Sequence, residues 1–203
     1  MEAGLHQVEQ LLLTEIASDY ELADMTARHL VQAGGKRFRP LLVLLAAEFG
    51  DPSAPGVVPA AVVVELTHLA TLYHDDVMDQ APLRRGTESA NARWGNTVAI
   101  LSGDFLFARS SKILADLGPD AVRVQAQTFE RLVIGQLKET VGPRSGEDPV
   151  AHHLAVLADK TGSLIAAAGR YGAMMSGAPA AVADSIAEFG ESIGIAFQLS
   201  DDL

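Results

Sequence analysis

Apolar residues recur along most of the chain at intervals of three and four, the spacing of helices that bury one face. Alternation with a period of two, bounded by tight hairpin turns, is nearly absent, so the pattern predicts helices rather than strands. Glycine and proline mark helix ends, as at Gly34 and Gly35 and at Gly118 and Pro119. The predicted helices are 5–16, 19–31, 40–49, 59–79, 97–117 and 120–141, with further helices from residue 150 onward.

Residues with strong local preferences place several of these boundaries. Asp19 is expected to cap the second helix, and Pro40 suits the first turn of the third. The apolar run 59–79 is too long for a strand and predicts a mostly buried helix. Small residues dominate 165–173, where neighbouring helices can approach closely. The sequence therefore predicts an all-α fold of eight or more helices arranged as a bundle.

Length and composition are those of a single globular domain over residues 1–203. Of the 203 residues, 48% are hydrophobic and 20% charged, with a mean hydropathy of +0.18. No Cys occurs, which excludes disulfides and thiolate chemistry. The longest apolar stretches, 41–47 and 57–64, are far shorter than the roughly 18 to 20 residues of a membrane span. The N-terminus lacks a basic segment followed by an apolar one, so we expect a cytoplasmic protein without a transmembrane segment.

The charged residues are unevenly distributed. Asp and Glu total 26 against 15 Lys and Arg, which gives a net charge of -11 and an isoelectric point near 4.8. Such a charge disfavours a broad contact with nucleic acid, so an anion site must be local. Five of the 15 basic residues fall in two short clusters: Lys36, Arg37 and Arg39, and then Arg84 and Arg85.

Three acidic residues stand at the C-terminal end of the 59–79 helix, in the motif DDVMD. Asp75 and Asp79 share one helix face about 5 to 6 Å apart, whereas Asp76 is turned about 100° away. Two such charges about 4 Å apart repel by about 4 kcal/mol at an effective dielectric of roughly 20. A hard cation would relieve this repulsion, and carboxylate ligands point to magnesium, which prefers substrate phosphates as further ligands. The alternative is a solvated helix end without a metal.

The two basic clusters suit the phosphates that such a metal would accompany. In GGKRFRP, two glycines precede Lys36 and Arg39, which lets backbone and side chains surround a phosphate at the start of a helix. Arg84 and Arg85 follow Asp79 closely, so their forked guanidinium groups return toward the same helix end. The alternative is a helix-ending glycine pair with incidental surface cations.

Six motifs follow one another along the chain: GGKRFRP, EL-x-H-x-x-x-L-x-HDDVMD, RRG, GD at Gly103 and Asp104, KTG from Lys160, and FQLSDD from Phe197. This ordered set resembles the trans-polyprenyl diphosphate synthases, over a match from about residue 25 to the last residue. The resemblance implies the isoprenoid-synthase fold, an antiparallel helical bundle around a central hydrophobic cavity. It also implies a magnesium-dependent prenyltransferase that joins an allylic diphosphate to isopentenyl diphosphate.

The resemblance assigns roles to individual residues. The implied catalytic group is Asp75, Asp76, Asp79, Lys160, Thr161 and Gln198. Magnesium would be held by Asp75, Asp79 and Asp201, with Asp76 and Asp202 as supporting groups. The isopentenyl diphosphate site would comprise Lys36, Arg39, His68 and Arg85. The allylic diphosphate site would comprise Arg84, Lys160 and Gln198.

Several residues have a simpler explanation without the resemblance. His68 would be a hydrogen-bonded core histidine, and Lys160 with Thr161 would be an ordinary helix start capped by the threonine. Gln136 is followed three residues later by Glu139, where the family often has Asp, so the resemblance assigns Glu139 no role. Three aromatic residues are expected in core packing rather than in a tunnel wall: Phe105, Phe107 and Phe129.

Product length is expected to depend on two small residues. In this family, bulky side chains four and five residues before the first Asp stop the growing chain. Those places are Thr71 and Ala70 here, about 6 to 7.5 Å along the helix, so the tunnel would stay open. We therefore expect a product longer than geranylgeranyl diphosphate, and a shorter one when Ala70 is replaced by Phe.

The end of the chain departs from the family pattern. Members usually continue past the second Asp-rich motif, whose third Asp would be residue 205, whereas this chain stops at Leu203. We expect a chain that is incomplete at its C-terminal end and weak or inactive as isolated. As in many helical families of this kind, we expect a homodimer.

Three other functions stay open. An HD-type metal phosphohydrolase is a rival because His68, His74, Asp75 and Asp79 resemble its ligands, and its product would be simple phosphate release. A class I terpene cyclase shares the first Asp-rich motif but generally lacks the GGKRFRP site. A non-catalytic partner subunit is the third, since some prenyl synthases pair an active chain with a degenerate one.

Overall fold

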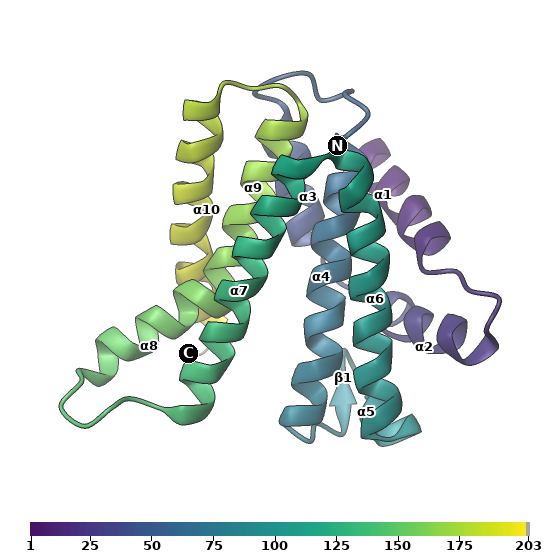
Figure 1. The fold of residues 1–203 in the computed structure, drawn as a ribbon, viewed down its shortest axis with the longest axis vertical. Helices are drawn as coiled ribbons and strands as arrows, with labels where there is room; N and C mark the ends of the chain where they lie inside the picture. Colours follow the sequence, from purple (N-terminus) through teal and green to yellow (C-terminus); the bar gives the residue numbers. More distant parts are fainter. Residues whose placement is uncertain (202–203) are drawn as a thin grey trace.

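The computed structural model describes the backbone of residues 1–201 and the side chains of residues 1–200, and it is a bundle of helices (Figure 1). The side chain of Asp201, and Asp202 altogether, lie outside the described residues. The described helices are α1 (Glu2–Glu15), α2 (Glu21–Gln32), α3 (Phe38–Ala47), α4 (Val57–Met78), α5 (Ala90–Trp94), α6 (Asn96–Leu117), α7 (Pro119–Val141), α8 (Pro149–Leu157), the π-helical turn η1 (Ala158–Gly162), α9 (Ser163–Met175) and α10 (Ala180–Asp201). The predicted all-α fold is confirmed.

The long helices begin and end close to their predicted boundaries. The predicted segments 59–79, 97–117 and 120–141 correspond to α4, α6 and α7 within two residues. Pro40 lies in the first turn of α3, as predicted. Asp19 is not the cap of α2, because the helix begins one residue later than the expected cap would allow. The carboxylate of Asp24 instead accepts a hydrogen bond from the Ser18 N–H at 3.2 Å, which holds the chain entering α2.

Three short elements between α4 and α6 were not predicted. Strands β1 (Leu83–Arg84) and β2 (Thr87–Glu88) form an antiparallel hairpin whose turn residues, Arg85 and Gly86, have φ values of 53° and 76°. Positive φ at both turn positions is the geometry of a tight two-residue hairpin turn. The short helix α5 follows, with the Ser89 side chain accepting a hydrogen bond from Ala92 N–H. Elements of two to five residues are too short to display a hydrophobic period.

Helix α4 is the centre of the bundle. It packs against α1, α3, α6 and α9 (Figure 1), and most of its residues are buried. Its length and mean hydropathy of 1.3 match a membrane span, but 67% of that apolar window is buried inside the protein. These values are those of a core helix that is surrounded by other helices.

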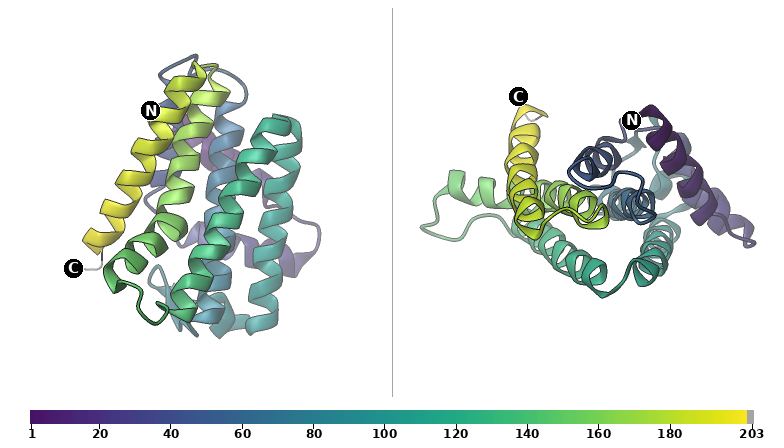
Figure 2. Two further views of the ribbon diagram at one scale, coloured as in Figure 1. Left: turned by 60° about the vertical axis from the view of Figure 1, so that its left-hand side comes forward. Right: turned by 90° about the horizontal axis from the view of Figure 1, so that it is seen from above.

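Small residues on α9 bring three helices close together, as the sequence predicts. A Cβ atom on Gly172 would lie only 2.1 Å from the carbonyl oxygen of Val43 on α3. On the other side α9 runs beside α10 (Figure 2). The first residue of α3 also meets the end of α10, where the rings of Phe38 and Phe197 stack with their centroids 5.6 Å apart.

Candidate functional site

A cavity of about 630 Å³ opens between α4 and α7, with further walls from α6, α9 and α10. It gathers residues that the sequence separates widely. The predicted site residues that line it are Arg39, His68, Thr71, Asp75, Lys160, Thr161 and Gln198. Most of the remaining lining is apolar: Leu72, Val77, Met78, Ile100, Phe129, Leu132, Val133, Leu137 and Leu164. The predicted central hydrophobic cavity thus has its charged groups at the places that the motifs indicate.

One aromatic prediction is wrong. Phe129 on α7 lines the cavity and is 36% exposed, so its ring is not part of the packed core. Phe107 packs against it, with ring centroids 4.6 Å apart, and both Phe105 and Phe107 are partly buried and pack against the hydrophobic core. The tunnel wall therefore includes an aromatic ring that the sequence pattern placed in the core.

The three carboxylates at the end of α4 have three different environments. Asp75 lines the cavity, Asp76 is fully buried, and Asp79 is exposed at the C-cap. Burial raises the pKa of Asp75; the charge of Lys160 opposes this shift, and that of Asp79 adds to it. Asp75 makes no ion pair with any residue in the described part of the chain. It is therefore an acidic group at the edge of an apolar cavity, influenced by the charge of Lys160 but without an ion-pair partner among the described residues.

Arg84 pairs with Asp76 rather than lining the cavity. Its Nη2 lies 2.5 Å from Asp76 Oδ1, and its Nε donates to the same oxygen at 2.6 Å. The hairpin turns the chain back toward α4, so an arginine from β1 reaches a carboxylate that faces away from Asp75 and Asp79. The sequence predicted that Arg84 contacts the allylic diphosphate. In the structure its guanidinium group forms an ion pair with Asp76.

The three basic residues of the GGKRFRP segment lie in three different environments, with Arg37 paired to Glu9 and Glu65. Arg39 lines the cavity, and its Nε is buried without a hydrogen-bond partner. The pKa of Arg39 is lowered to about 10, mainly by burial; the charge of Glu65 opposes this shift and that of Arg85 adds to it. Arg85 donates to the carbonyl oxygens of Leu30 and Gly34. Lys36 is exposed and does not line the cavity.

His68 lies between this basic group and the aspartates. Burial lowers its pKa well below the usual histidine value, and Arg39, Arg85, Arg84 and Arg37 lower it further in that order. The folded protein therefore keeps His68 as a neutral imidazole that lines the cavity. A neutral ring retains one N–H donor and one nitrogen acceptor for a ligand.

Replacing His68 with Gln is expected to flatten the dependence of stability on pH below about pH 6.5. Because the unfolded chain takes up a proton at the ordinary histidine pKa of about 6.5 and the folded protein does not, the unfolded state binds more protons as the pH falls. Below that pH the wild-type free energy of unfolding should lose up to about 1.4 kcal/mol per pH unit from this group. Denaturant unfolding between about pH 7 and pH 5 measures the slope.

The matched control is His6→Gln, which changes an exposed histidine on α1. Its slope should equal that of the wild type. A His68→Gln protein with the wild-type slope would mean that His68 is protonated in the folded state.

Lys160 and Thr161 are not an ordinary helix start. They lie in η1, a π-helical turn between α8 and α9, and turns of this kind are often found at functional sites. The wider turn packs closely against α7, where a Cβ on Gly135 would lie 2.7 Å from the backbone nitrogen of Lys160. Thr161 accordingly does not cap a helix, and its hydroxyl donates to Gln198 Oε1 at 3.2 Å.

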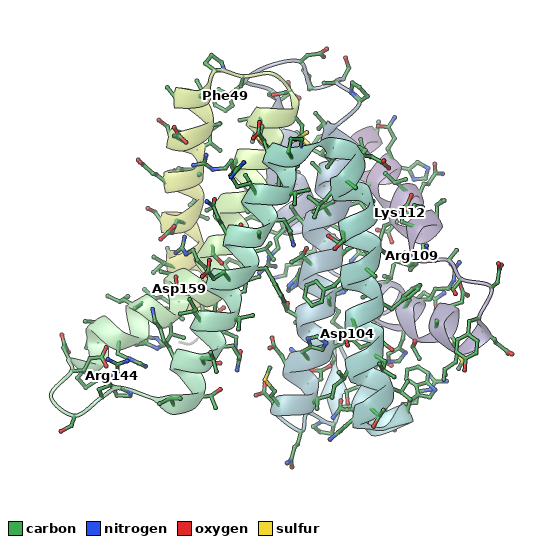
Figure 3. The ribbon with its side chains drawn as sticks, viewed as in Figure 1. Phe49, Asp104, Arg109, Lys112, Arg144 and Asp159 are labelled. Carbon is green, nitrogen blue, oxygen red and sulfur yellow. The ribbon has the colours of Figure 1, made fainter. Side chains whose placement is uncertain are left out.

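Ionic contacts from α7 hold this turn. Lys160 Nζ lies 2.5 Å from Glu139 Oε2, which gives the unassigned Glu139 a partner. Asp159, labelled in Figure 3, pairs with Arg131 at 2.9 Å and with Lys138 at 2.7 Å. The motif noted around Gln136 was the only sequence signal for these contacts on α7. These ion pairs attach two consecutive residues of the turn, Asp159 and Lys160, to α7.

His74 explains the GD motif. A Cβ on Gly103 would lie 2.4 Å from His74 Nε2, so only glycine leaves room for that ring. Asp104, labelled in Figure 3, has its Oδ1 3.4 Å from the same nitrogen. The motif therefore positions a histidine that lines the cavity, a role that the sequence did not indicate.

The two residues expected to control product length differ in position. Thr71 lines the cavity, whereas Ala70 is fully buried and does not. A Cβ on Gly103 of α6 would lie 3.1 Å from the Ala70 carbonyl oxygen, so Ala70 is on the side of α4 that packs against α6. Of the two, Thr71 is the residue that a substrate in the cavity can touch.

The end of the cavity next to Asp75 and Asp79 offers oxygen ligands, which hard cations prefer. Asp75 and Asp79 offer carboxylate oxygens, and Asp75 lacks an ion-pair partner. Among the side chains of residues 1–200, no three His, Asp or Glu groups converge as a ready-made metal cluster. A cation would therefore share ligands with another group, such as a diphosphate.

Comparison with known proteins agrees with this geometry. The family model described as polyprenyl synthetase matches residues 21–203. A nonaprenyl diphosphate synthase from Mycobacterium tuberculosis is 50% identical over 100% of this chain and 61% of its own length. Heptaprenyl diphosphate synthase component 2 from Geobacillus stearothermophilus is 40% identical over 98% of this chain and 62% of its own.

A solved structure is also closely similar. Geranylgeranyl pyrophosphate synthase from Corynebacterium glutamicum, complexed with calcium and isoprenyl diphosphate, has a TM-score of 0.89 at 51% identity, over 99% of this chain and 62% of that chain. This chain thus spans about three-fifths of the length of the relatives that it matches. The fold, the ordered motifs around one cavity and the match from residue 21 onward agree, and the chain belongs to the polyprenyl synthetase family.

Proposed function

We propose that the complete protein is a trans-polyprenyl diphosphate synthase that adds isopentenyl diphosphate units to an allylic diphosphate. The observation that carries this proposal is that one apolar cavity is lined by an acidic group and a basic group, each without an ion-pair or hydrogen-bond partner among the described residues. Asp75 makes no ion pair with a described residue at one place on its lining, and the buried Nε of Arg39 lacks a hydrogen-bond acceptor at another. A metal diphosphate supplies both complements, and the apolar wall suits a prenyl chain. Because the chain spans about three-fifths of its relatives, the reaction is proposed for the complete protein.

Magnesium is the proposed cofactor, with Asp75 and Asp79 as ligands together with Asp201, which lies outside the described side chains. When bound, the metal supplies charge neutralisation for the departing diphosphate. The calcium in the Corynebacterium structure supports a divalent cation in a protein of this family.

The remaining residues are proposed to bind the two substrates and to exclude water. Arg39, His68, Arg85 and Lys36 are proposed to bind isopentenyl diphosphate, and Lys160, Gln198 and Arg84 to bind the allylic diphosphate. Leu132 and Phe129 exclude water from the allylic cation that the leaving diphosphate generates. The alkene of isopentenyl diphosphate forms the new carbon–carbon bond with this cation, and the released diphosphate takes the proton that is lost. The polypeptide thus binds, orients and shelters the reactants without acting as a nucleophile.

Product length is proposed to exceed geranylgeranyl length, and Thr71→Phe is expected to shorten it. A phenyl ring at this position would occupy the cavity, whereas threonine leaves it open. Chromatographic sizing of the products measures the change. Ala70→Phe, the other predicted blocking substitution, should also disturb the buried contact with α6, so its thermal stability is measured alongside. An unchanged distribution from a folded Thr71→Phe enzyme would contradict the tunnel assignment.

The proposed assembly is a cytoplasmic homodimer. A non-catalytic partner subunit is kept as the second candidate because one relative is named as component 2 of a heptaprenyl diphosphate synthase. Sedimentation of the purified protein distinguishes a self-associating chain from one that requires a different subunit.

Product analysis tests the reaction itself. The complete protein is incubated with magnesium, isopentenyl diphosphate and geranyl, farnesyl or geranylgeranyl diphosphate. Elongated prenyl diphosphates with release of inorganic diphosphate support the proposal, and loss of both on adding EDTA supports the cofactor. Simple phosphate release would favour a phosphohydrolase, and no turnover without a second subunit would favour the partner-subunit alternative.

A further inference from the structure

One buried carboxylate faces the arginines at the basic side of the cavity. Glu65 lies on α4, one turn before His68, and is only 2% exposed. The three guanidinium groups near it, those of Arg37, Arg39 and Arg85, form the basic cluster. They come from the segment at the start of α3 and from the turn of the β-hairpin.

Arg37 is bound directly to Glu65. Its Nη1 lies 3.0 Å from Glu65 Oε1, while its Nε and Nη2 donate to the two carboxylate oxygens of Glu9 at 2.8 and 3.0 Å. The backbone of Arg37 has φ of 47°, a left-handed conformation that residues other than glycine rarely adopt. The two acidic partners offset the cost of holding Arg37 there.

Arg39 and Arg85 also depend on the charge of Glu65, although they make no hydrogen bond to it. Burial lowers the pKa of each guanidinium, and the carboxylate of Glu65 opposes that shift in both. The hydrogen bonds of Arg85 go to uncharged carbonyl oxygens. A Cβ on Gly35 would lie 2.9 Å from Arg37 Nη1 and 3.0 Å from Arg85 Nη1, so these two cations are close neighbours.

We propose that Glu65 is the built-in counterion of the basic cluster, which stabilises the ligand-free protein at the expense of diphosphate affinity. This inference rests on the proposed function of the same cavity as a diphosphate site. Glu65 and Glu9 together carry two negative charges against the three positive charges of the cluster, so the cluster keeps an excess of positive charge for an anion. A diphosphate that arrives at Arg39 and Arg85 relieves the same repulsion that Glu65 relieves in its absence.

Glu65→Gln keeps the shape of the side chain and removes its charge. The ligand-free variant is expected to melt about 5 °C lower than the wild type, because the three close cations then keep only the carboxylate of Glu9, which pairs with Arg37. Inorganic pyrophosphate should bind about tenfold more tightly than to the wild type. Isothermal titration calorimetry in EDTA measures this affinity without a metal at the aspartate end. A purely packing role of Glu65 would change the melting temperature and leave the affinity unchanged.

Two variants control this result. Glu9→Gln removes the other carboxylate that holds Arg37, but it does not act on Arg39 or Arg85, so its pyrophosphate affinity should match the wild type. Glu65→Asp restores the charge and should return the affinity to within about twofold of the wild type. A Glu65→Gln protein with unchanged or weaker affinity, beside a wild type that binds, would overturn this inference alone. A wild type that does not bind pyrophosphate would overturn the proposed diphosphate site itself.

Folding gives an independent test should Glu65→Gln prove too unstable to titrate. The double variant Glu65→Gln with Arg37→Met removes one negative and one positive charge together. It is expected to melt at a higher temperature than Glu65→Gln alone, because the cluster then holds two cations instead of three. A double variant that is no more stable than the single one, or that also fails to fold, would overturn the counterion role.

Discussion

Asp75→Asn is expected to lower kcat for prenyl transfer by about a thousandfold or more in the complete enzyme, with the fold intact. Asp75 is the acidic side chain that lines the cavity, and it makes no ion pair within the described residues. Asparagine keeps the size of the side chain but removes the charge that a divalent cation requires. Steady-state release of inorganic diphosphate, with farnesyl diphosphate as primer and saturating magnesium, measures the loss.

The control for this prediction is Asp116→Asn, the same change at an exposed position on α6. It should leave kcat within about twofold of the wild type. Calorimetry with this chain adds a readout that is independent of turnover, because magnesium should strengthen binding of a farnesyl analogue to the wild type and not to Asp75→Asn. Full activity of Asp75→Asn would remove the carboxylate from the proposed metal site.

Arg84→Met is expected to reduce the free energy of unfolding by about 3 kcal/mol. The substitution preserves an unbranched apolar stem but leaves the carboxylate of Asp76 fully buried without its ion-pair partner. Asp76 Oδ2 already lacks a hydrogen-bond partner, so no other described group compensates. Denaturant unfolding measures the loss.

Two further variants identify the cause of that loss. Arg123→Met changes an exposed arginine on α7 and should cost less than about 0.5 kcal/mol. The double variant Asp76→Asn with Arg84→Met removes both charges and should recover more than half of the stability lost in Arg84→Met. Additive losses in the double variant would show that the pair does not interact in the folded protein.

The sequence predicted the parts of the fold that rest on long, regular periods. Helix α4 is found within two residues of its predicted bounds because its apolar run has no internal break. The β-hairpin and α5 were missed because their geometry depends on single residues, such as Arg85 in a left-handed conformation. The turn η1 was missed because one wide turn is set by contact with Gly135 of α7, which no local pattern encodes.

The sequence predicted the motif residues that line the cavity. It did not predict the ion pairs that motif residues form with one another. Asp75 and His68 line the cavity as the motifs imply. Helical spacing correctly turned Asp76 away from Asp75, but the sequence did not indicate that it would pair with Arg84. Glu65 was part of a quoted motif without a role, because its partners come from segments distant in sequence. Side chains that support a site are brought together by tertiary contacts, so no regular spacing in the sequence identifies them.

The stacked rings of Phe38 and Phe197 link the order of synthesis to the assembly of the protein. Phe38 is translated first, and Phe197 follows it 159 residues later (197 − 38). At about 5 to 20 residues per second, the nascent polypeptide waits roughly 10 to 30 seconds before this aromatic contact can form. The segment that contains Arg37 and Arg39 therefore completes its packing only after most of α10 has been made.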